Sequence, residues 1–326
     1  MPLNKVNLCW VLSDGRRGHE IQSTTLATGL AEQTNILPFY IKQPWDSFTP
    51  RLMPLFKRGI CWHRGTPNFK QNPDLIITTG RKAAAAGKYV VANLSRTVPH
   101  IQILHPGDRP SQYDLLLLPA HDQKTGPNII TFNGSIHPYH PTWFNPVNAN
   151  HETPCPVIML GNPKSAYFES RWPAELDQIK NSYPGAPLFV CGSPRTQSMI
   201  KQRVQSSLSA ADNCWFGADD GDNPYVAWMR AASHLFVTTD SINMMNECAA
   251  SHALVSLLAK DFIPSPKHRR FIDSCAERWT GLAKNNSQEQ ADLTLRTQPV
   301  KYALDQVLAD DRLLKLLKSP NSSSGG

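Results

Sequence analysis

The chain has 326 residues, of which 40% are hydrophobic and 18% are charged, and its formal net charge is +7. These values are ordinary for a folded protein of roughly two domains of about 150 residues each. No apolar run reaches the about 18 residues of a membrane-spanning helix. The N-terminal residues also lack the apolar stretch and cleavage site of a secretory signal. We therefore expect a cytoplasmic protein.

The seven cysteines are scattered and never form a CxxC pair, which argues against a disulfide framework and against a zinc site. We expect neither a metal nor a cofactor. A moderate positive charge suits an anionic small molecule such as a nucleotide diphosphate, or an acidic membrane surface. No nucleic-acid-binding motif is present, so we expect no nucleic acid partner. Peripheral membrane contact and a protein partner stay open.

Short runs rich in Val, Ile and Leu alternate with helix-like segments along the chain. The runs are apolar on both faces, as in parallel strands that helices cover. Strands are predicted at Val6–Leu12, Asn35–Tyr40, Asp74–Thr79, His100–Leu104, Asp114–Leu118, Asn128–Phe132, Pro156–Leu160, Pro187–Cys191, His234–Thr239 and Ala253–Leu258. Helices are predicted at Glu20–Gln33, Lys82–Asn93, Ser165–Ser182, Thr196–Ser209, Pro224–Ala232, Ile242–Ser251, Lys267–Ala276 and Leu304–Leu317.

This rhythm predicts an α/β protein with two Rossmann-like, doubly wound domains. The proline-rich stretch His137–Pro156 reads as a linker. We therefore expect an N-terminal domain over residues 1–150 and a C-terminal, nucleotide-binding domain over 151–318. Residues 319–326 are rich in Ser and Gly and are expected to be disordered. The prolines and aromatic residues of Pro44–Asn72 suggest an irregular insertion.

In the first half, three polar turns follow predicted strands. The first, Ser13–Glu20, also opens a helix, so its glycines allow a tight turn and its amides can meet a ligand. Its Asp14 and His19 are candidates for a catalytic base, although a capped glycine turn is the simpler reading. The residues assigned to a binding site in these turns are Gly15, Arg16, Gly18, Gly80, Arg81, His121 and Asp122.

In the second half, two turns follow a strand and precede a helix, beginning at Gly161 and at Gly192. A helix N-terminus with a Ser or Thr cap and a nearby cation can bind phosphate, although ordinary capping is the alternative. The candidate residues of these turns are Gly161, Ser193, Arg195 and Thr196.

The segment Thr238–Glu247 carries the sharpest motif of this half. Asp240 or Ser241 caps the predicted helix and leaves amides for a diphosphate, while Glu247 can accept two hydrogen bonds from a ribose diol. Met244 is also assigned to the site, although core packing is the more ordinary role of such a residue. The remaining binding candidates are Asn223, Tyr225 and Lys267.

The order of these motifs resembles that of the mitochondrial fission family founded on a plant elongated-mitochondria mutant. The motifs are WxLSDGxxGHExQ from Trp10, PDLIIxxGR from Pro73, QILHP, DLLLLPxHD, NPY and VTxDSxxMxxE ending at Glu247. The resemblance implies a GT-B-like fold, with the two domains facing each other across a cleft. Two turns depart from the family pattern: paired arginines are reduced to Arg195, and a Gly-Gly turn is Gly161-Asn162, which weakens the implied diphosphate contact.

The first glycine turn is similar to that of the peptidoglycan transferase that adds N-acetylglucosamine to a lipid-linked acceptor. The segment Asp240–Glu247 is similar to the nucleotide-holding turn of GT-B transferases and of UDP-N-acetylglucosamine 2-epimerase. We therefore expect a metal-independent glycosyltransferase that moves a sugar from a nucleotide sugar to an envelope or lipid-linked acceptor. The alternatives are a non-catalytic adaptor in membrane or mitochondrial fission, on the cytosolic face of mitochondria in a eukaryote, and a hydrolysing epimerase.

Overall fold

A computed structural model of the protein describes residues 5–51, 59–144, 155–193, 196–282 and 299–318. The chain divides into two compact units. The first unit is built from Met1–Pro138 together with Ala303–Gly326, and the second unit is Tyr139–Tyr302. The predicted disordered tail, residues 319–326, lies outside the described residues.

The first unit contains a seven-stranded sheet in the order β3-β2-β1-β4-β5-β6-β7. All neighbouring strands are parallel except β3, which pairs antiparallel with β2. The strands are β1 (Val6–Ser13), β2 (Ala31–Ile41), β3 (Ile60–Trp62), β4 (Leu75–Thr79), β5 (His100–Ile103), β6 (Leu115–Pro119) and β7 (Ile129–Phe132). The strand β3 lies in the segment that we expected to be irregular.

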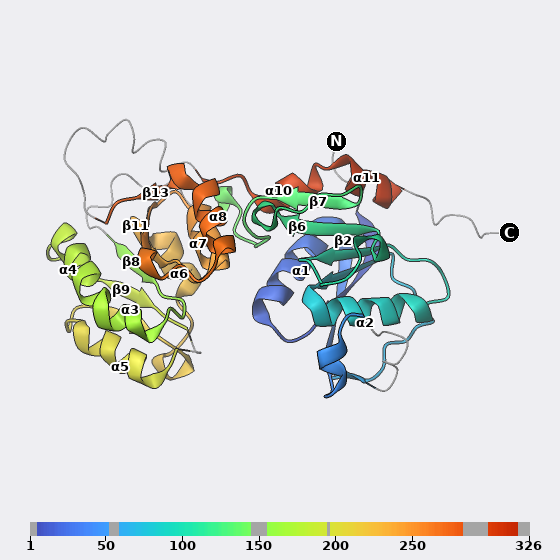
Figure 1. The fold of residues 1–326 in the computed structure, drawn as a ribbon, viewed down its shortest axis with the longest axis horizontal. Coiled ribbons are helices and arrows are strands. Elements are labelled where there is room, and N and C mark those ends of the chain that lie inside the picture. Colours follow the sequence, from blue (N-terminus) through green and yellow to red (C-terminus); the bar gives the residue numbers. More distant parts are fainter. Residues whose placement is uncertain (1–4, 52–58, 145–154, 194–195, 283–298, 319–326) are drawn as a thin grey trace. The chain divides into compact units, whose positions relative to one another are not determined.

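Helices cover both faces of this sheet (Figure 1). Alternate residues of β1 face opposite sides, as the pleat of a strand requires. Cys9 and Val11 pack against α1 (Arg17–Leu30), while Trp10 and Leu12 pack against α2 (Gly80–Asn93). The first unit is therefore doubly wound, with one apolar layer on each face of the sheet.

The end of the chain returns to the first unit. It forms α10 (Ala303–Leu308) and α11 (Asp311–Lys318), where the sequence predicted one helix. The break falls at Asp310, whose carboxylate accepts the amide of Arg312 at 2.9 Å. Ala303, Val307 and Leu313 are buried in the core beside α1, and Figure 1 shows both helices in red near β7. The prediction kept this helix with the second domain, whereas its apolar face packs on the first.

The second unit contains a six-stranded parallel sheet in the order β10-β9-β8-β11-β12-β13. The strands are β8 (Pro156–Met159), β9 (Phe189–Cys191), β10 (Asn213–Trp215), β11 (His234–Thr238), β12 (Leu254–Leu258) and β13 (Trp279–Thr280). The short edge strands β10 and β13 were not predicted, because two or three residues carry no readable periodicity.

The second sheet is also covered on both faces. Helices α6 (Tyr225–Ala231), α7 (Ile242–Ala249) and α8 (Pro266–Ser274) pack on one face, and α3 (Ser165–Ser170), α4 (Trp172–Ser182) and α5 (Ser198–Ser207) pack on the other. The sequence predicted α3 and α4 as one helix; Pro173, which lacks an amide proton, sits in the first turn of α4 where the new helix begins. Two doubly wound α/β sheets confirm the predicted fold class.

Short 3-10 helices occupy the turns: η1 (Trp45–Phe48), η3 (Pro110–Gln112), η4 (Ala120–Asp122), η5 (Pro141–Trp143), η6 (Ala218–Asp220), η7 (Lys260–Phe262) and η8 (Ala276–Arg278). The predicted linker is only partly described, since residues 145–154 lie outside the described set. Its earlier part packs on the second unit, where Phe144 is buried. This contact places the unit boundary at Pro138 rather than near residue 150.

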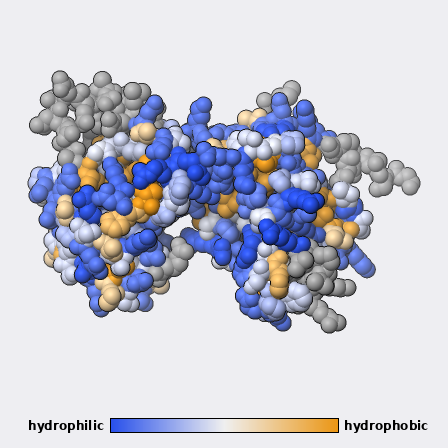
Figure 2. All heavy atoms as spheres, viewed as in Figure 1, coloured by the Kyte–Doolittle hydropathy of each residue, from blue (hydrophilic) through white to orange (hydrophobic). Residues whose placement is uncertain are grey.

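Within the described residues, no helix is both long and apolar enough to cross a bilayer. Hydrophilic residues cover most of the face drawn in Figure 2, and the apolar residues form small separate spots on it. Single exposed apolar side chains of this kind are normal on folded proteins.

We predict that Leu313→Ala destabilises the first unit by about 2–5 kcal/mol, because it opens a cavity under α11. Hydrogen exchange followed by mass spectrometry should show faster exchange in peptides of β6 and β7 and unchanged exchange in the second unit. Lys318→Ala, at an exposed position of the same helix, is the matched control. Equal exchange in the two variants would contradict the assignment of α11 to the first core.

Candidate functional site

A carboxylate and an imidazole meet in the first unit, directly after β1. Both carboxylate oxygens of Asp14 lie 3.2 Å from Nδ1 of His19. The Asp14 side chain is 2% exposed and that of His19 is 21% exposed. Asp14 therefore fixes the orientation of the His19 ring through Nδ1. Asp14 does not contact the other ring nitrogen, Nε2. An imidazole oriented in this way is suited to accept a proton at Nε2.

The charge of Asp14 is stabilised although its side chain is buried. Burial alone raises the pKa of this carboxyl, but the hydrogen bond with His19 and the Arg16 amide, at 3.2 Å, bring the pKa below its ordinary value. The carboxylate is therefore ionised at neutral pH. It favours the His19 tautomer that carries its proton on Nδ1, facing the negative charge.

The His19 ring packs so closely on residue 80 that this position requires glycine. A Cβ atom on this glycine would lie 2.6 Å from Cε1 of the His19 ring, and its φ of +78° favours glycine independently. Ser23 Oγ, 2.6 Å from Thr79 Oγ1, ties α1 to the end of β4 beside this contact. The structure thus brings together three of the predicted residues, Asp14, His19 and Gly80.

The other predicted residues of the first unit differ in how close they lie to this pair. Gly15 has a φ of +77°, and Arg16 Nε lies 3.9 Å from Asp14. Gly18 is the second residue of α1. Arg81 interacts instead with Asp46 of η1, at 3.5 Å. His121, which is buried, and Asp122 occupy η4 after β6, which is two strands from β4 in the sheet.

In the second unit, Asp240 joins two turns that follow neighbouring strands. Its Oδ2 accepts the amide of Asn162 at 2.7 Å, and the amide of Gly161 donates to Thr238 Oγ1 at 2.9 Å. A Cβ atom on Gly161 would lie 2.5 Å from the Asp240 carboxylate, so this position needs glycine. The Gly161 turn therefore uses its Asn162 amide to hold Asp240, and that amide is not available to a phosphate.

The second oxygen of Asp240 is an unsatisfied acceptor. Among the described residues, Oδ1 is buried without a hydrogen-bond partner. The backbone carbonyl of Asp240 lies 3.2 Å from Nε2 of His268, and His268 Nδ1 lies 2.8 Å from Ser265 Oγ. A carboxylate oxygen accepts hydrogen bonds and repels phosphate, so this group suits a ligand hydroxyl or amide better than an anion.

Helix α7 begins as the sequence predicted. Ser241 is its N-cap, with Oγ accepting the amide of Met244 at 3.4 Å. Helix N-termini leave amides without intrahelical partners and favour negative charge. The part-buried Met244 also packs against the core of the second unit. The first turn of α7 therefore has the N-cap that the sequence predicted.

Glu247 lies further along α7, is 9% exposed and accepts a hydrogen bond from the Tyr225 hydroxyl. Burial, reinforced by the charge of Glu247, raises the pKa of Tyr225 well above its ordinary value, so the phenol keeps its proton and donates. Asn223 positions Tyr225 by accepting its amide at 2.9 Å. These three predicted residues therefore form one hydrogen-bonded group at the start of α6 and on α7.

The turn after β9 is only partly described. Ser193 and Thr196 bond to each other, with the Ser193 amide donating to Thr196 Oγ1 at 3.3 Å, and Arg195 lies outside the described residues. Lys267 is the second residue of α8, next to His268. The structure joins Gly161 to Asp240 and Tyr225 to Glu247, while no contact described here links those pairs to Ser193 or Thr196.

Sequence reasoning missed several polar groups next to these residues. His268 lies in the predicted helix Lys267–Ala276, and Asp46 lies in the segment expected to be an irregular insertion. Glu175, buried in α4, accepts from Tyr167 at 2.8 Å and from the Ala259 amide at 3.3 Å. Burial raises the pKa of Glu175, although these two hydrogen bonds oppose the shift. The spacing of α4 could have revealed Glu175, because it lies three residues after Trp172 and four before Ile179, on the face of the helix that is buried.

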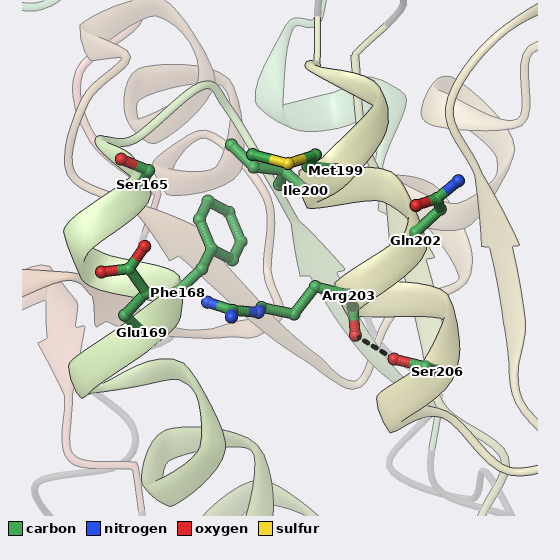
Figure 3. A pocket seen from close by; sticks show the side chains of 8 residues that line it. All are labelled: Ser165, Phe168, Glu169, Met199, Ile200, Gln202, Arg203 and Ser206. Carbon is green, nitrogen blue, oxygen red and sulfur yellow. Dashed lines mark hydrogen bonds between the residues drawn. The ribbon is translucent and has the colours of Figure 1, made fainter.

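A surface pocket of about 390 Å³ lies between α3 and α5 (Figure 3). It is lined by Phe168 and Glu169 of α3 and by Met199 and Arg203 of α5, among others, and includes none of the predicted site residues. Met199 is 77% exposed. The pocket lies between two helices on one face of the sheet, and its Ser165 is the first residue of α3, directly after the Gly161 turn.

Comparisons with known proteins found one similar sequence and several similar structures. A Rickettsia prowazekii protein, RP120, is 24% identical over 325 residues, covering 85% of this chain and 90% of its own. A Listeria monocytogenes structure assigned as a UDP-N-acetylglucosamine 2-epimerase superposes with a TM-score of 0.54 at 12% identity, covering 94% of this chain and 95% of its own. Acinetobacter baumannii MurG gives a TM-score of 0.49 at 12% identity, covering 93% and 98%.

The epimerase likeness shows the fold, which is GT-B-like, as the sequence resemblance implied. At this identity it does not show the activity. The family model described as "Mitochondrial fission ELM1" matches residues 17–303, which include most of the motifs that suggested that family. The chain belongs to the mitochondrial fission ELM1 family.

Proposed function

We propose that the protein transfers a sugar from a nucleotide sugar to an acceptor hydroxyl, with His19 as the general base. The observation that carries this proposal is the Asp14–His19 pair, in which a buried carboxylate orients an imidazole whose other nitrogen it does not contact. A structural histidine could be held by one polar contact. A ring packed on a glycine and held by both oxygens of a carboxylate is better explained as a positioned base.

The second unit is proposed to bind the nucleotide. The N-terminal turn of α7 would receive the diphosphate, and Lys267 would add positive charge. Glu247 would accept the ribose hydroxyls, exchanging its bond with Tyr225 for bonds to the ligand or sharing it with them. The unsatisfied oxygen of Asp240 would accept a hydroxyl of the donor sugar. The Listeria neighbour, assigned to UDP-N-acetylglucosamine, makes uridine nucleotides the first ligands to test.

The proposed reaction is a single displacement. His19 Nε2 takes the proton of the acceptor hydroxyl while the acceptor oxygen forms a bond to the anomeric carbon. The bond between that carbon and the phosphate oxygen breaks, and its electron pair leaves with the nucleotide diphosphate. Helix amides and Lys267 stabilise the departing charge. Asp14 stabilises the imidazolium that forms, as its lowered pKa indicates.

We predict that Glu247→Gln weakens binding of the nucleotide by about tenfold or more, because hydrogen bonds to a charged acceptor are the strong ones. Calorimetry with UDP, GDP, ADP and CMP sugars would identify the ligand and then measure the loss. Glu277→Gln, an exposed glutamate of the same unit, should bind as the wild type does. A folded wild-type protein that binds none of the four nucleotide sugars would refute the donor site.

We predict that His19→Gln lowers turnover by about a hundredfold or more, within the range of general base catalysis, and leaves nucleotide binding unchanged. Asp14→Asn should also lower turnover, since it removes the charge that favours the imidazolium. The measurement is release of nucleotide diphosphate from the bound nucleotide sugar, with cell extract as acceptor source. His63→Gln, at an exposed histidine of the first unit, is the control. Unchanged turnover in His19→Gln would rule out this base, whereas a folded wild type without any turnover would favour the adaptor alternative.

A further inference from the structure

A cavity of about 540 Å³ in the first unit is formed by three separate segments. Its lining includes Phe48, Thr49 and Arg51, which end or follow η1, and Arg81 in the first turn of α2. The third wall is Pro106-Gly107, in the turn after β5. Since β4 and β5 are parallel neighbours, two walls come from the carboxyl edge of the sheet, where ligands of such folds bind.

Two guanidinium groups line this cavity. Arg51 Nη2 donates to the carbonyl of Gly107 at 3.3 Å, so the side chain reaches from one wall to another. The Arg81 side chain is 48% exposed, and its Nη2 lies 3.5 Å from Asp46 Oδ1. A guanidinium has five N–H donors, so both groups can form further hydrogen bonds.

The charges around the cavity favour an anion. Asp46 is shared between Arg81 and Lys82, whose Nζ lies 2.7 Å from Oδ2. Among the described residues, the Arg51 guanidinium donates to a neutral carbonyl and pairs with no carboxylate. Asp108, which follows Gly107, is paired with Lys88. The balance near Arg51 and Arg81 is therefore positive, and guanidinium groups match the oxygens of phosphate in pairs.

The cavity also has an apolar part. One of its lining residues, Arg81, follows Gly80 in the chain, the glycine on which the His19 ring packs. Phe48 is 46% exposed and lies in the lining with Pro50 and Pro106, so it offers an apolar surface to the carbon part of the same ligand.

The geometry points to a binding site for a phosphate-bearing acceptor, with its phosphate on Arg51 and Arg81 and its carbon part against Phe48. The identification of this ligand as the acceptor rests on the proposed sugar transfer. The inference that a phosphate-bearing ligand binds in this cavity does not rest on it. The phosphate can belong to an amphiphilic lipid phosphate or to a soluble phosphate ester, and the binding experiment separates these sources.

The test is calorimetry on the full chain with octyl phosphate, glycerol 3-phosphate and octanoate, the octyl compounds below their micelle concentrations. We expect octyl phosphate to bind and both Arg51→Gln and Arg81→Gln to weaken it about tenfold, as loss of a charged hydrogen-bond donor should. Arg64→Gln, at an exposed arginine outside the lining, should have no effect. Phe48→Ala should weaken octyl phosphate and leave glycerol 3-phosphate unchanged.

Equal binding of both phosphates, with the same dependence on the arginines, would support the phosphate site and assign a soluble ester. The inference is overturned if neither phosphate binds, if both arginine variants bind like the wild type, or if octanoate binds as tightly as octyl phosphate. Nucleotide-sugar binding is measured on the same samples. A protein that binds octyl phosphate through these arginines but no nucleotide sugar would retain the site and lose the transferase proposal.

Discussion

A parallel sheet that is buried on both faces places all its strand-to-helix turns along one edge, and this constraint organises the molecule. Connections between parallel strands must cross a face, so each strand ends at the edge where its helix begins. Asp14, Gly80 and Asp240 occupy such turns and come from three different strands. Within each unit, the sheet brings together turns from different strands, such as Gly80 with His19 and Asn162 with Asp240.

The sequence could predict this arrangement where the apolar runs were long. Strands such as β1 and β11, with core side chains on both faces, were located within one or two residues, because buried parallel strands are continuous apolar runs. The strands β3, β10 and β13 were missed because two or three residues have no period to detect. The position of α10 and α11 was missed for another reason: an amphipathic pattern shows that a helix packs, but not against which sheet.

The sequence predicted which turns carry the residues of the candidate site. It predicted much less well which side chains contact each other there. Asp14 with His19, and Tyr225 with Glu247, are close in the fold because a helix turn or a pair of neighbouring helices joins them. The sequence motif suggested that the Asp240 turn binds phosphate. The structure instead shows its carboxylate bound to the Asn162 amide and its other oxygen unsatisfied among the described residues. No spacing rule reveals which oxygen of a carboxylate is occupied, since that depends on a turn about eighty residues away.

The return of α10 and α11 makes the second unit an insertion within the first, since the chain leaves the first unit at Pro138 and re-enters it at Ala303. During translation, the sheet of the first unit is therefore made long before the residues that complete the cover of one of its faces beside α1 emerge. Val307 and Leu313 would fill that face only after the intervening unit has been made. A nascent chain would then carry a partly uncovered apolar surface for the time needed to synthesise residues 139–302. Folding of the first unit would therefore be completed only after the second unit has been made.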